Sequence, residues 1–344
     1  MSQVLGTRAR KASPPKRAEL HPFEAAVLET VRRRRLLGPA DSTVAALSGG
    51  PDSTALVAAL SALHRAGEAG PVIACHVDHG LRPGSERDAA HCRGLCARLG
   101  LRFAARSVRV RPGNVQAQAR RARYAALRAA AAEAGAARIA TGHTRADQAE
   151  TVVLRLLRGA GARGLAGIPP RRGALVRPLI DRSREEVLAY LAARGLPALE
   201  DPSNATGRFL RNRVRAEVMP ALRRLAPAAE RALARAADLL RGDDRALERS
   251  ARALHRGKRA EVEALLAAAA AVRRRVVRRL WKAATGSRRG LTAEHVASVL
   301  RLLRRPRPGR ISLPGGVEAR VAGGRLEMAG GRDGNDCAPA RALL

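Results

Sequence analysis

Between residues 42 and 194, short apolar runs alternate with segments of helical periodicity, and this alternation strongly limits the possible folds. The expected strands cover residues 42–47, 71–78, 101–110, 137–142 and 174–180. Helical patterns lie between and after them, at about 52–66, 85–99 and 114–134, within ADQAETVVLRLLRG, and at 184–194. Strands joined by helices of about ten or more residues predict an α/β fold with a doubly wound parallel sheet. Ligands of such sheets bind beyond the carboxyl ends of the strands.

The second half of the chain has a different pattern. Residues 216–305 consist mainly of Ala, Leu and Arg at helical spacing, which predicts a helical region almost without strands. Glycine turns within residues 304–331 predict a small C-terminal β hairpin. We expect five parts: a basic leader with a first helix (1–40), an α/β domain (41–222), a helical region (223–305), a small β element (306–332) and a disordered tail (333–344).

The charge of the chain indicates a polyanionic partner. Lys and Arg number 65 against 30 Asp and Glu, a formal net charge of +35 that is spread over the whole sequence. Such an excess is typical of proteins that bind nucleic acid. A membrane surface is the alternative, but no segment alternates basic and apolar faces as that would need. The basic N-terminus also lacks the apolar core of a secretory signal, so we expect a cytoplasmic protein.

The cysteines argue against a zinc site or a dithiol redox centre. The chain has four Cys residues and no C-x-x-C pair. Cys92 and Cys96 stand four apart on an expected helix, where we predict that they pack as small hydrophobic side chains.

A glycine turn, LSGGPDST at residues 47–54, joins the first expected strand to a helix. In that arrangement the backbone N–H groups of the loop and helix N-terminus converge on an anion, and the glycines allow it to approach. Pro51 suits the first helical turn, and Ser48, Ser53 and Thr54 add hydroxyl groups. A P-loop would need a lysine that this sequence lacks. The remaining alternative is a tight turn without a ligand.

The pattern Ser-Gly-Gly-x-Asp-Ser resembles the PP-loop of the N-type ATP pyrophosphatases, which split ATP into AMP and pyrophosphate. Five more motifs follow in order: HVDHGLRPGSERD, GNVQAQARRARYAAL, TGHTRADQAETVVLRLLRG with its continuation, RPLIDRSREEVLAYL and DPSNATGRFLRNRVR. Over residues 42–222 their order and wording resemble the tRNA(Ile)-lysidine synthetases. The resemblance implies ATP binding by Ser48, Gly49, Gly50, Pro51, Asp52 and Ser53.

Two carboxylates stand at the start of the helix that follows the fourth expected strand. Asp147 and Glu150 are three residues apart, which places them on one helical face. Such a pair can hold Mg²⁺ together with ATP phosphates, or bind and deprotonate a substrate ammonium group. The alternative is a capping box, with Thr144 as the N-cap and Asp147 as its acidic partner.

Further site residues are implied by the resemblance. It assigns catalytic roles to Asp52, Arg120, His143, Asp147 and Glu150. Arg211, Arg213 and Arg215 follow a DPSN turn, and Arg211 and Arg215 share a helical face; we expect these arginines to bind tRNA, the alternative being a merely solvated face. His76, Asp78 and His79 have no further ligand spacing beside them, so we expect no resident metal, only Mg²⁺ that accompanies ATP. The sequence departs from the family at Ala146 and Gln116, where acidic residues are usual.

The resemblance implies a reaction and its participants. ATP would adenylate O2 of the wobble cytidine in a tRNA(Ile) with a CAU anticodon, and free lysine would displace AMP to form lysidine. Base stacking would fall to Arg side chains or to Tyr124, Phe209 and Trp281, because aromatic residues make up only 2% of the chain. A homodimer is one assembly that the sequence allows. The alternatives are a tRNA thiolation enzyme of the same ATP fold and a non-catalytic RNA-binding protein.

Overall fold

The computed structural model describes residues 19–78, 80, 85–108, 115–199, 210–305 and 307–330. The expected leader before residue 19, His79, Phe209, the DPSN turn and the expected tail lie outside these residues. The chain divides into two compact units, residues 1–237 (unit 1) and 238–344 (unit 2). Each unit is described by itself.

Unit 1 contains the predicted parallel sheet. Its strands lie in the order β3-β2-β1-β4-β6-β5, and all neighbours are parallel except β5 and β6. The first four strands and β6 match the five predicted ones; β5, a two-residue edge strand of arginines, has no apolar pattern and was not predicted. The bounds are β1 Thr43–Ala46, β2 Val72–Asp78, β3 Arg102–Ser107, β4 Arg138–Ala140, β5 Arg171–Arg172 and β6 Leu175–Val176.

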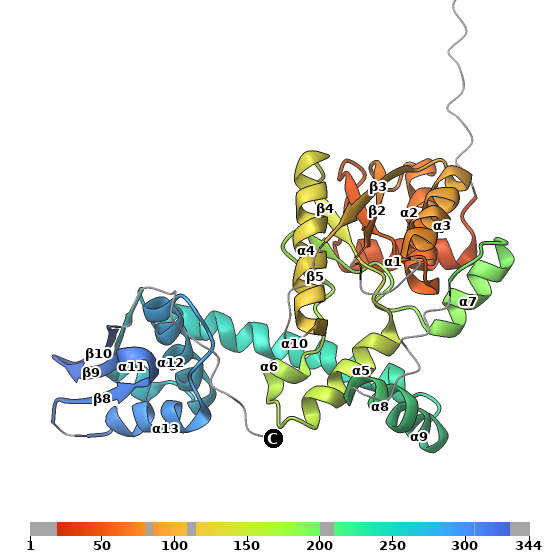
Figure 1. Ribbon diagram of the computed structural model, residues 1–344. Helices are drawn as coiled ribbons and strands as arrows, with labels where there is room; N and C mark the ends of the chain where they lie inside the picture. Colours follow the sequence, from red (N-terminus) through yellow and green to blue (C-terminus); the bar gives the residue numbers. More distant parts are fainter. Residues whose placement is uncertain are drawn as a thin grey trace, which may run out of the picture. The chain divides into compact units, whose positions relative to one another are not determined.

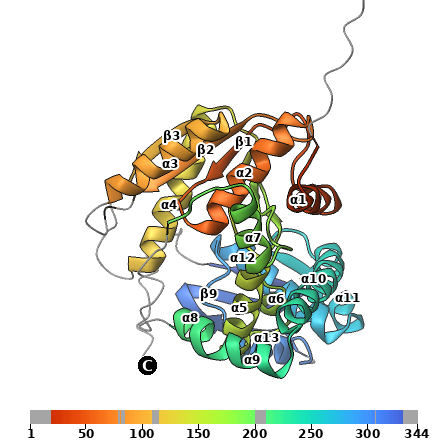
Figure 2. The same ribbon diagram turned by 90° about the vertical axis from the view of Figure 1, so that its right-hand side faces the viewer.

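Helices cover both faces of this sheet, which confirms the doubly wound fold. Along β1 the side chain of Ala45 packs with α1, α2 and α7, whereas that of Val44 packs with α4. This period of two is what a strand buried on both faces requires. Figures 1 and 2 show α4 on one side of the strands and α2 and α3 on the other. The helices are α1 Pro22–Arg33, α2 Pro51–Arg65, α3 Ser85–Leu99, α4 Val115–Glu133, α5 Arg145–Leu156, α6 Ala162–Leu165 and α7 Arg184–Ala193.

The order of the strands determines where a ligand can bind. From β1 the chain proceeds outward to β2 and β3, then returns to β4 on the other side of β1. The loops after β1 and β4 therefore diverge at a topological switch point, where doubly wound sheets bind their ligands. The glycine turn and the acidic helix α5 both begin at this point.

A short helical segment after residue 209 packs against α5. It consists of α8 (Leu210–Arg213), a π-helical turn (Val214–Val218) and α9 (Met219–Leu225). Val214 and Met219 are buried against Ala149 and Val153 of α5. This packing sets the arginines of the segment beside the N-terminal half of α5.

Unit 2 contains a small antiparallel sheet with its own core. Its strand order is β7-β10-β9-β8, so the predicted hairpin exists as part of a four-stranded sheet. Strand β7 lies within residues 216–305, where we expected almost no strands; it is three residues long and only its middle residue is buried. The elements after α10 (Ala229–Ala253) are β7 Arg259–Glu261, α11 Val262–Ala267, α12 Ala270–Thr285, α13 Ala293–Leu302, β8 Gly309–Leu313, β9 Val317–Ala322 and β10 Arg325–Ala329.

The core of unit 2 includes Trp281, which corrects one expectation. Trp281 is only 4% exposed and its indole N–H donates to the carbonyl of Arg289 over 2.9 Å. The side chain packs with Leu280, Val317 and Leu326. It is therefore a core residue in unit 2 and is not available to stack on a base.

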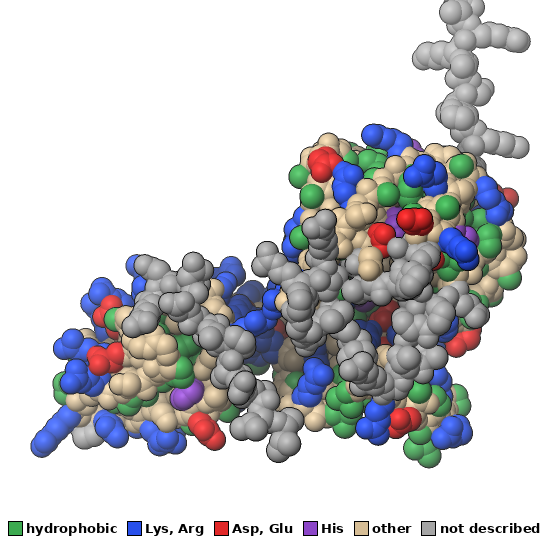
Figure 3. All heavy atoms as spheres, in the orientation of Figure 1, with side chains coloured by type: hydrophobic (Ala, Val, Ile, Leu, Met, Phe, Trp, Pro, Cys, Tyr) green, Lys and Arg blue, Asp and Glu red, His purple; other side chains and the backbone are tan. Residues whose placement is uncertain are grey.

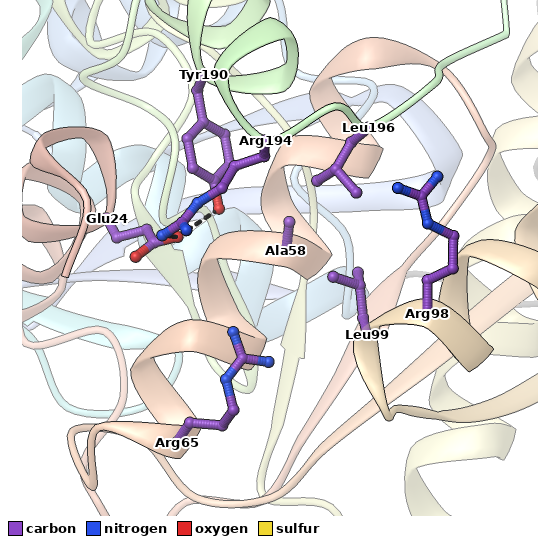
Figure 4. Close-up of a pocket in the computed structure, with 8 residues that line it drawn as sticks. All are labelled: Glu24, Ala58, Arg65, Arg98, Leu99, Tyr190, Arg194 and Leu196. Atoms are coloured by element: carbon purple, nitrogen blue, oxygen red, sulfur yellow. Dashed lines mark hydrogen bonds and ion pairs between the residues drawn. The ribbon is translucent and has the colours of Figure 1, made fainter. Parts of the chain in front are cut away.

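The C-terminal ends of α2, α3 and α7 border a hollow of about 240 Å³ (Figure 4). Beside it the buried Glu24 carboxylate accepts hydrogen bonds from the Tyr190 hydroxyl and from Arg194, over 2.7 and 2.6 Å. The ring of Tyr190 stacks on Phe23 with centroids 4.4 Å apart. These contacts join α1 to α7, so we assign this cluster a structural role. Among the described residues, no helix is both long and apolar enough to cross a bilayer.

Candidate active site

The glycine turn after β1 is shaped by one unusual backbone position. Gly49 has φ of +85°, and a Cβ there would lie 2.7 Å from Leu199 Cδ1, so only glycine fits without strain. Gly50 is the N-cap of α2, and Pro51 occupies the first turn, as the sequence predicts. The N-terminus of α2 therefore faces the switch point with free backbone N–H groups, which favours an anion there.

Hydroxyl groups hold the shape of this turn. The Ser53 hydroxyl donates to the Gly50 carbonyl over 2.9 Å and accepts from the Ser48 backbone N–H over 3.1 Å. The buried Thr54 hydroxyl donates to the Gly49 carbonyl over 3.2 Å. Because these bonds lie within the loop, they fix its conformation before any ligand binds.

The loop after β4 lies directly against the start of α2. A Cβ on Gly142 would lie 2.8 Å from the Asp52 backbone carbonyl oxygen, so the two loops touch through their backbones. In the same loop, His143 Nδ1 lies 2.9 Å from the Thr141 hydroxyl. Burial lowers the pKa of His143 to about 4, although Asp147 opposes the shift, so its imidazole is neutral at pH 7.

Asp147 has two roles in the structure. Its Oδ2 accepts the Thr144 backbone N–H over 2.9 Å, which is the capping interaction that the sequence left as an alternative. Its Oδ1 accepts from Arg211 Nη2 over 2.8 Å. One carboxylate oxygen of Asp147 thus caps α5, while the other accepts a hydrogen bond from an arginine of the segment after residue 209.

Glu150 is more deeply buried than Asp147. The residue is 3% exposed and accepts from Arg211 Nε over 3.1 Å and from Arg215 Nε over 2.6 Å. Arg211 and Arg215 therefore share a face, as predicted from their spacing. Arg213 points elsewhere and forms an exposed pair with Glu217. We refer to Asp147, Glu150, Arg211 and Arg215 as the charged cluster.

Asp52 lies in the first turn of α2 near this cluster. Burial raises its pKa to about 6, and Asp147 adds to the shift while Arg184 and Arg215 oppose it. The Oδ1 atom is buried and has no hydrogen-bond partner among the described residues. A buried, unpaired carboxylate oxygen is a suitable ligand for a hard cation such as Mg²⁺. In the described part of the chain no three His, Cys, Asp or Glu side chains form a metal cage. Phosphate oxygens and water would supply the other ligands of such an ion.

Arg120 contacts Tyr124, and near Tyr124 lies Arg177, a residue that sequence analysis missed. Arg120 Nη2 donates to the Tyr124 hydroxyl over 3.3 Å, with its guanidinium 5.2 Å from the ring centroid. Arg177, which is 4% exposed, lies near Tyr124: burial lowers the pKa of its guanidinium and Tyr124 partly offsets that shift. The charge of Arg177 also acts on His143. Arg177 stands in the RPLID motif, but in a chain so rich in arginine a single Arg carries little signal.

A hollow of about 440 Å³ lies at the carboxyl ends of β2 and β3, one strand over from the glycine turn. Nine residues line it: His76, Asp78, Glu86, Ala89, Ala90, Arg93, Ala105, Arg106 and Ser107. Of the HVDHGLRPGSERD motif, His76, Asp78 and Glu86 line this hollow, and residues 79 and 81–84 lie outside the described part of the chain. Cys92 and Cys96 are buried, as predicted, and burial raises the pKa of both thiols, to about 12 and about 11.

The predicted positive surface is present in the structure. Figure 3 shows Lys and Arg side chains distributed over both units. In unit 1, exposed arginines include Arg213, whose side chain is 60% exposed. Charge of this kind supplies the non-specific part of nucleic-acid binding.

A doubly wound sheet with a Ser-Gly-Gly turn at its switch point defines the class of PP-loop proteins that use ATP. Residues 23–222 match the family model of the PP-loop domain, and residues 261–327 match the TilS substrate binding domain. The chain belongs to the tRNA(Ile)-lysidine synthase family.

Curated relatives support this assignment over most of the chain. The tRNA(Ile)-lysidine synthase of Salinispora arenicola is 42% identical over 331 residues, which cover 90% of this chain and 98% of the relative. That of Symbiobacterium thermophilum is also 42% identical, over 88% of this chain and 68% of the relative. The Thermus thermophilus enzyme is 45% identical, but the chain spans only 58% of its length. Among solved structures, U34-tRNA thiolase NcsA from Methanococcus maripaludis has the same fold: its TM-score is 0.54 at 18% identity, over 64% of this chain and 78% of that chain.

Proposed function

We propose that this protein uses ATP to attach lysine to C2 of the wobble cytidine in tRNA(Ile) with a CAU anticodon, forming lysidine. The observation that carries the proposal is the meeting of an anion-binding turn and an acidic pair, half-buried Asp147 and buried Glu150, at one switch point of the sheet. The first suits a polyphosphate and the second suits a cationic amine. We assign the catalytic domain to residues 41–222 and further tRNA contacts to residues 223–305.

ATP binds with its pyrophosphate portion on the turn formed by Ser48, Gly49 and Gly50, at the N-terminus of α2. Asp52 Oδ1 is the protein ligand for the Mg²⁺ that neutralises phosphate charge there. The nucleoside end reaches toward the hollow at the ends of β2 and β3. Arg120, held by Tyr124, lies where it can stabilise negative charge that develops during adenylation.

Lysine binds through its ammonium group at Asp147 and Glu150. In the structure these carboxylates hold the Arg211 and Arg215 guanidinium groups, so the site already accepts cations. The bound amine must lose a proton before it attacks, and a carboxylate of the pair accepts that proton. The Nε–C2 bond forms, the C2–O2 bond breaks, and AMP leaves with O2. His143 stays neutral beside this pair and adds no competing positive charge.

The exposed Arg213 and the general positive charge of the surface attract the tRNA backbone. Arg211 and Arg215 are candidates for tRNA contacts as well, and contact with RNA phosphates would release them from the acidic pair. The arrangement thereby connects tRNA arrival with access of lysine to its carboxylates. Sulfur transfer receives no support from the described cysteines, because Cys75, Cys92 and Cys96 are all buried with raised pKa values.

Lysine incorporation tests the proposal directly. The purified protein is incubated with ATP, Mg²⁺, radiolabelled lysine and one of two tRNA transcripts: the CAU isoleucine tRNA, or the same tRNA with uridine at the wobble position. Label should enter only the first transcript, with AMP and pyrophosphate released in equal amounts. ATP cleavage that depends on tRNA without lysine incorporation would leave the adenylating fold intact and reject the lysine assignment.

A further inference from the structure

Leu47 connects β1 to the PP-loop and has an unusual set of backbone partners. The parallel pairing of β1 with β2 ends at Ala46 and Cys75. The Leu47 N–H still donates to the Cys75 carbonyl over 2.9 Å. The carbonyl of Leu47, however, lies beyond Ala46 and Cys75, the last residues that β1 and β2 pair. Leu47 is 2% exposed, and a buried carbonyl without a partner is costly. The hydrogen-bond partner of the Leu47 carbonyl therefore affects the position of the PP-loop, which begins at Ser48.

The partner is a side chain of β2. His76 Nδ1 lies 3.0 Å from the Leu47 carbonyl oxygen, and His76 is 5% exposed. Because a carbonyl oxygen only accepts, Nδ1 carries the proton and donates it. Cys92 Sγ, 3.6 Å from the same nitrogen, packs beside the imidazole. The same thiol lies 4.0 Å from the Leu47 carbonyl oxygen, so it is a second and weaker donor beside the imidazole.

We propose that His76 is a positioning residue for the PP-loop. Its imidazole donates the hydrogen bond that a further step of the β1–β2 ladder would have supplied. Both backbone polar groups of Leu47 remain tied to β2, while the chain from Ser48 onward turns away from the sheet to form the anion site. His76 also lines the hollow assigned to the nucleoside end of ATP. Its bond to Leu47 fixes the residue from which the loop starts, and so pre-organises the loop for polyphosphate.

Three substitutions separate this role from general stability. His76→Asn places an amide N–H near the position of Nδ1, His76→Gln moves the donor outward along the side chain, and His76→Leu removes it. The assay measures the Kd of pyrophosphate with Mg²⁺ on the full chain, without tRNA or lysine, because pyrophosphate occupies the loop without the nucleoside that the hollow beside His76 would hold. The thermal midpoint of each variant is recorded alongside.

The Asn variant should bind pyrophosphate within about threefold of wild type, whereas Gln and Leu should weaken binding about tenfold. Wild-type affinity in all three variants, or an Asn variant as weak as Leu, would overturn the proposal. If the Leu variant does not fold, the comparison of Asn with Gln still decides. The inference rests only on ATP binding by the PP-loop, so a failure of lysine transfer would leave it standing.

Discussion

Substituting Gly142 by Ala tests the contact between the loops after β1 and β4. The new Cβ would lie 2.8 Å from the Asp52 carbonyl oxygen, 2.9 Å from its carbonyl carbon and 3.2 Å from the Ser53 nitrogen. These are backbone atoms of α2, whose residues 53–63 are all buried, so they cannot move aside alone. The loops must separate by about 0.6 Å, and overpacking of this kind costs about 1–3 kcal/mol.

Two measurements read out this separation: the urea midpoint of unfolding and the Kd of an ATP analogue. The unfolding free energy should fall by about 1–3 kcal/mol, and ATP affinity by about tenfold, since a misplacement near 1 Å costs up to about 100-fold. Gly94→Ala is the matched control, because it adds the same methyl group within α3 with no atom inside 4 Å. That variant should gain about 0.5–1 kcal/mol and keep its ATP affinity. Wild-type stability and affinity in Gly142→Ala would refute the reasoning.

Three further substitutions have defined outcomes. Burial raises the pKa of Asp52 from 3.8 to about 6, so its ionised form costs stability above pH 6 and the cost disappears as the pH falls toward 3.8. Asp52→Asn should accordingly add about 2–3 kcal/mol to the unfolding free energy at pH 7.5 and less at pH 5; equal gains in urea titrations at both pH values would contradict the burial argument. Glu150→Gln removes the charge that Arg211 and Arg215 contact. In steady-state lysine transfer its KM for lysine should rise by at least about 100-fold, with the ATP Kd unchanged; an equal loss of ATP affinity would instead place Glu150 at the nucleotide. Tyr124→Phe keeps the ring beside Arg120 but removes the hydroxyl to which Arg120 donates. We expect kcat to fall about tenfold without a change in ATP Kd, and an unchanged kcat would reject the positioning of Arg120 by Tyr124.

The sheet could be predicted from sequence because its buried parallel strands are apolar on both faces. TVAA of β1 and the first residues of VIACHVD in β2 are short continuous runs of mostly apolar residues. Such runs are typical of parallel strands that helices cover on both faces. Strands β5 and β7 were missed because they are two and three residues long and mostly charged. Their pairing depends on neighbours such as β6 and β10, whose position is not encoded in the strand itself.

The candidate site was only partly accessible to sequence reasoning. The spacing of Asp147 and Glu150 placed both on one face of α5, and a shared contact with Arg211 bears this out. The partners themselves could not be predicted, because Arg211 lies 61 residues from Glu150 along the chain. The missing hydrogen-bond partner of Asp52 Oδ1 is likewise a property of packing, which no local pattern records.

The helix that carries the PP-loop is enclosed by the core, whereas the arginines that face the acidic pair are held by ion pairs on a short helical segment. Residues 53–63 of α2 are buried, while the side chains of Arg211 and Arg215 are 37% and 44% exposed. One wall of the site is therefore rigid and the opposite wall is replaceable. Changes of substrate can accumulate in residues 210–218 without disturbing the core that positions ATP. A fold with this asymmetry can keep one energy-supplying half while different nucleophiles and acceptors are fitted to the other.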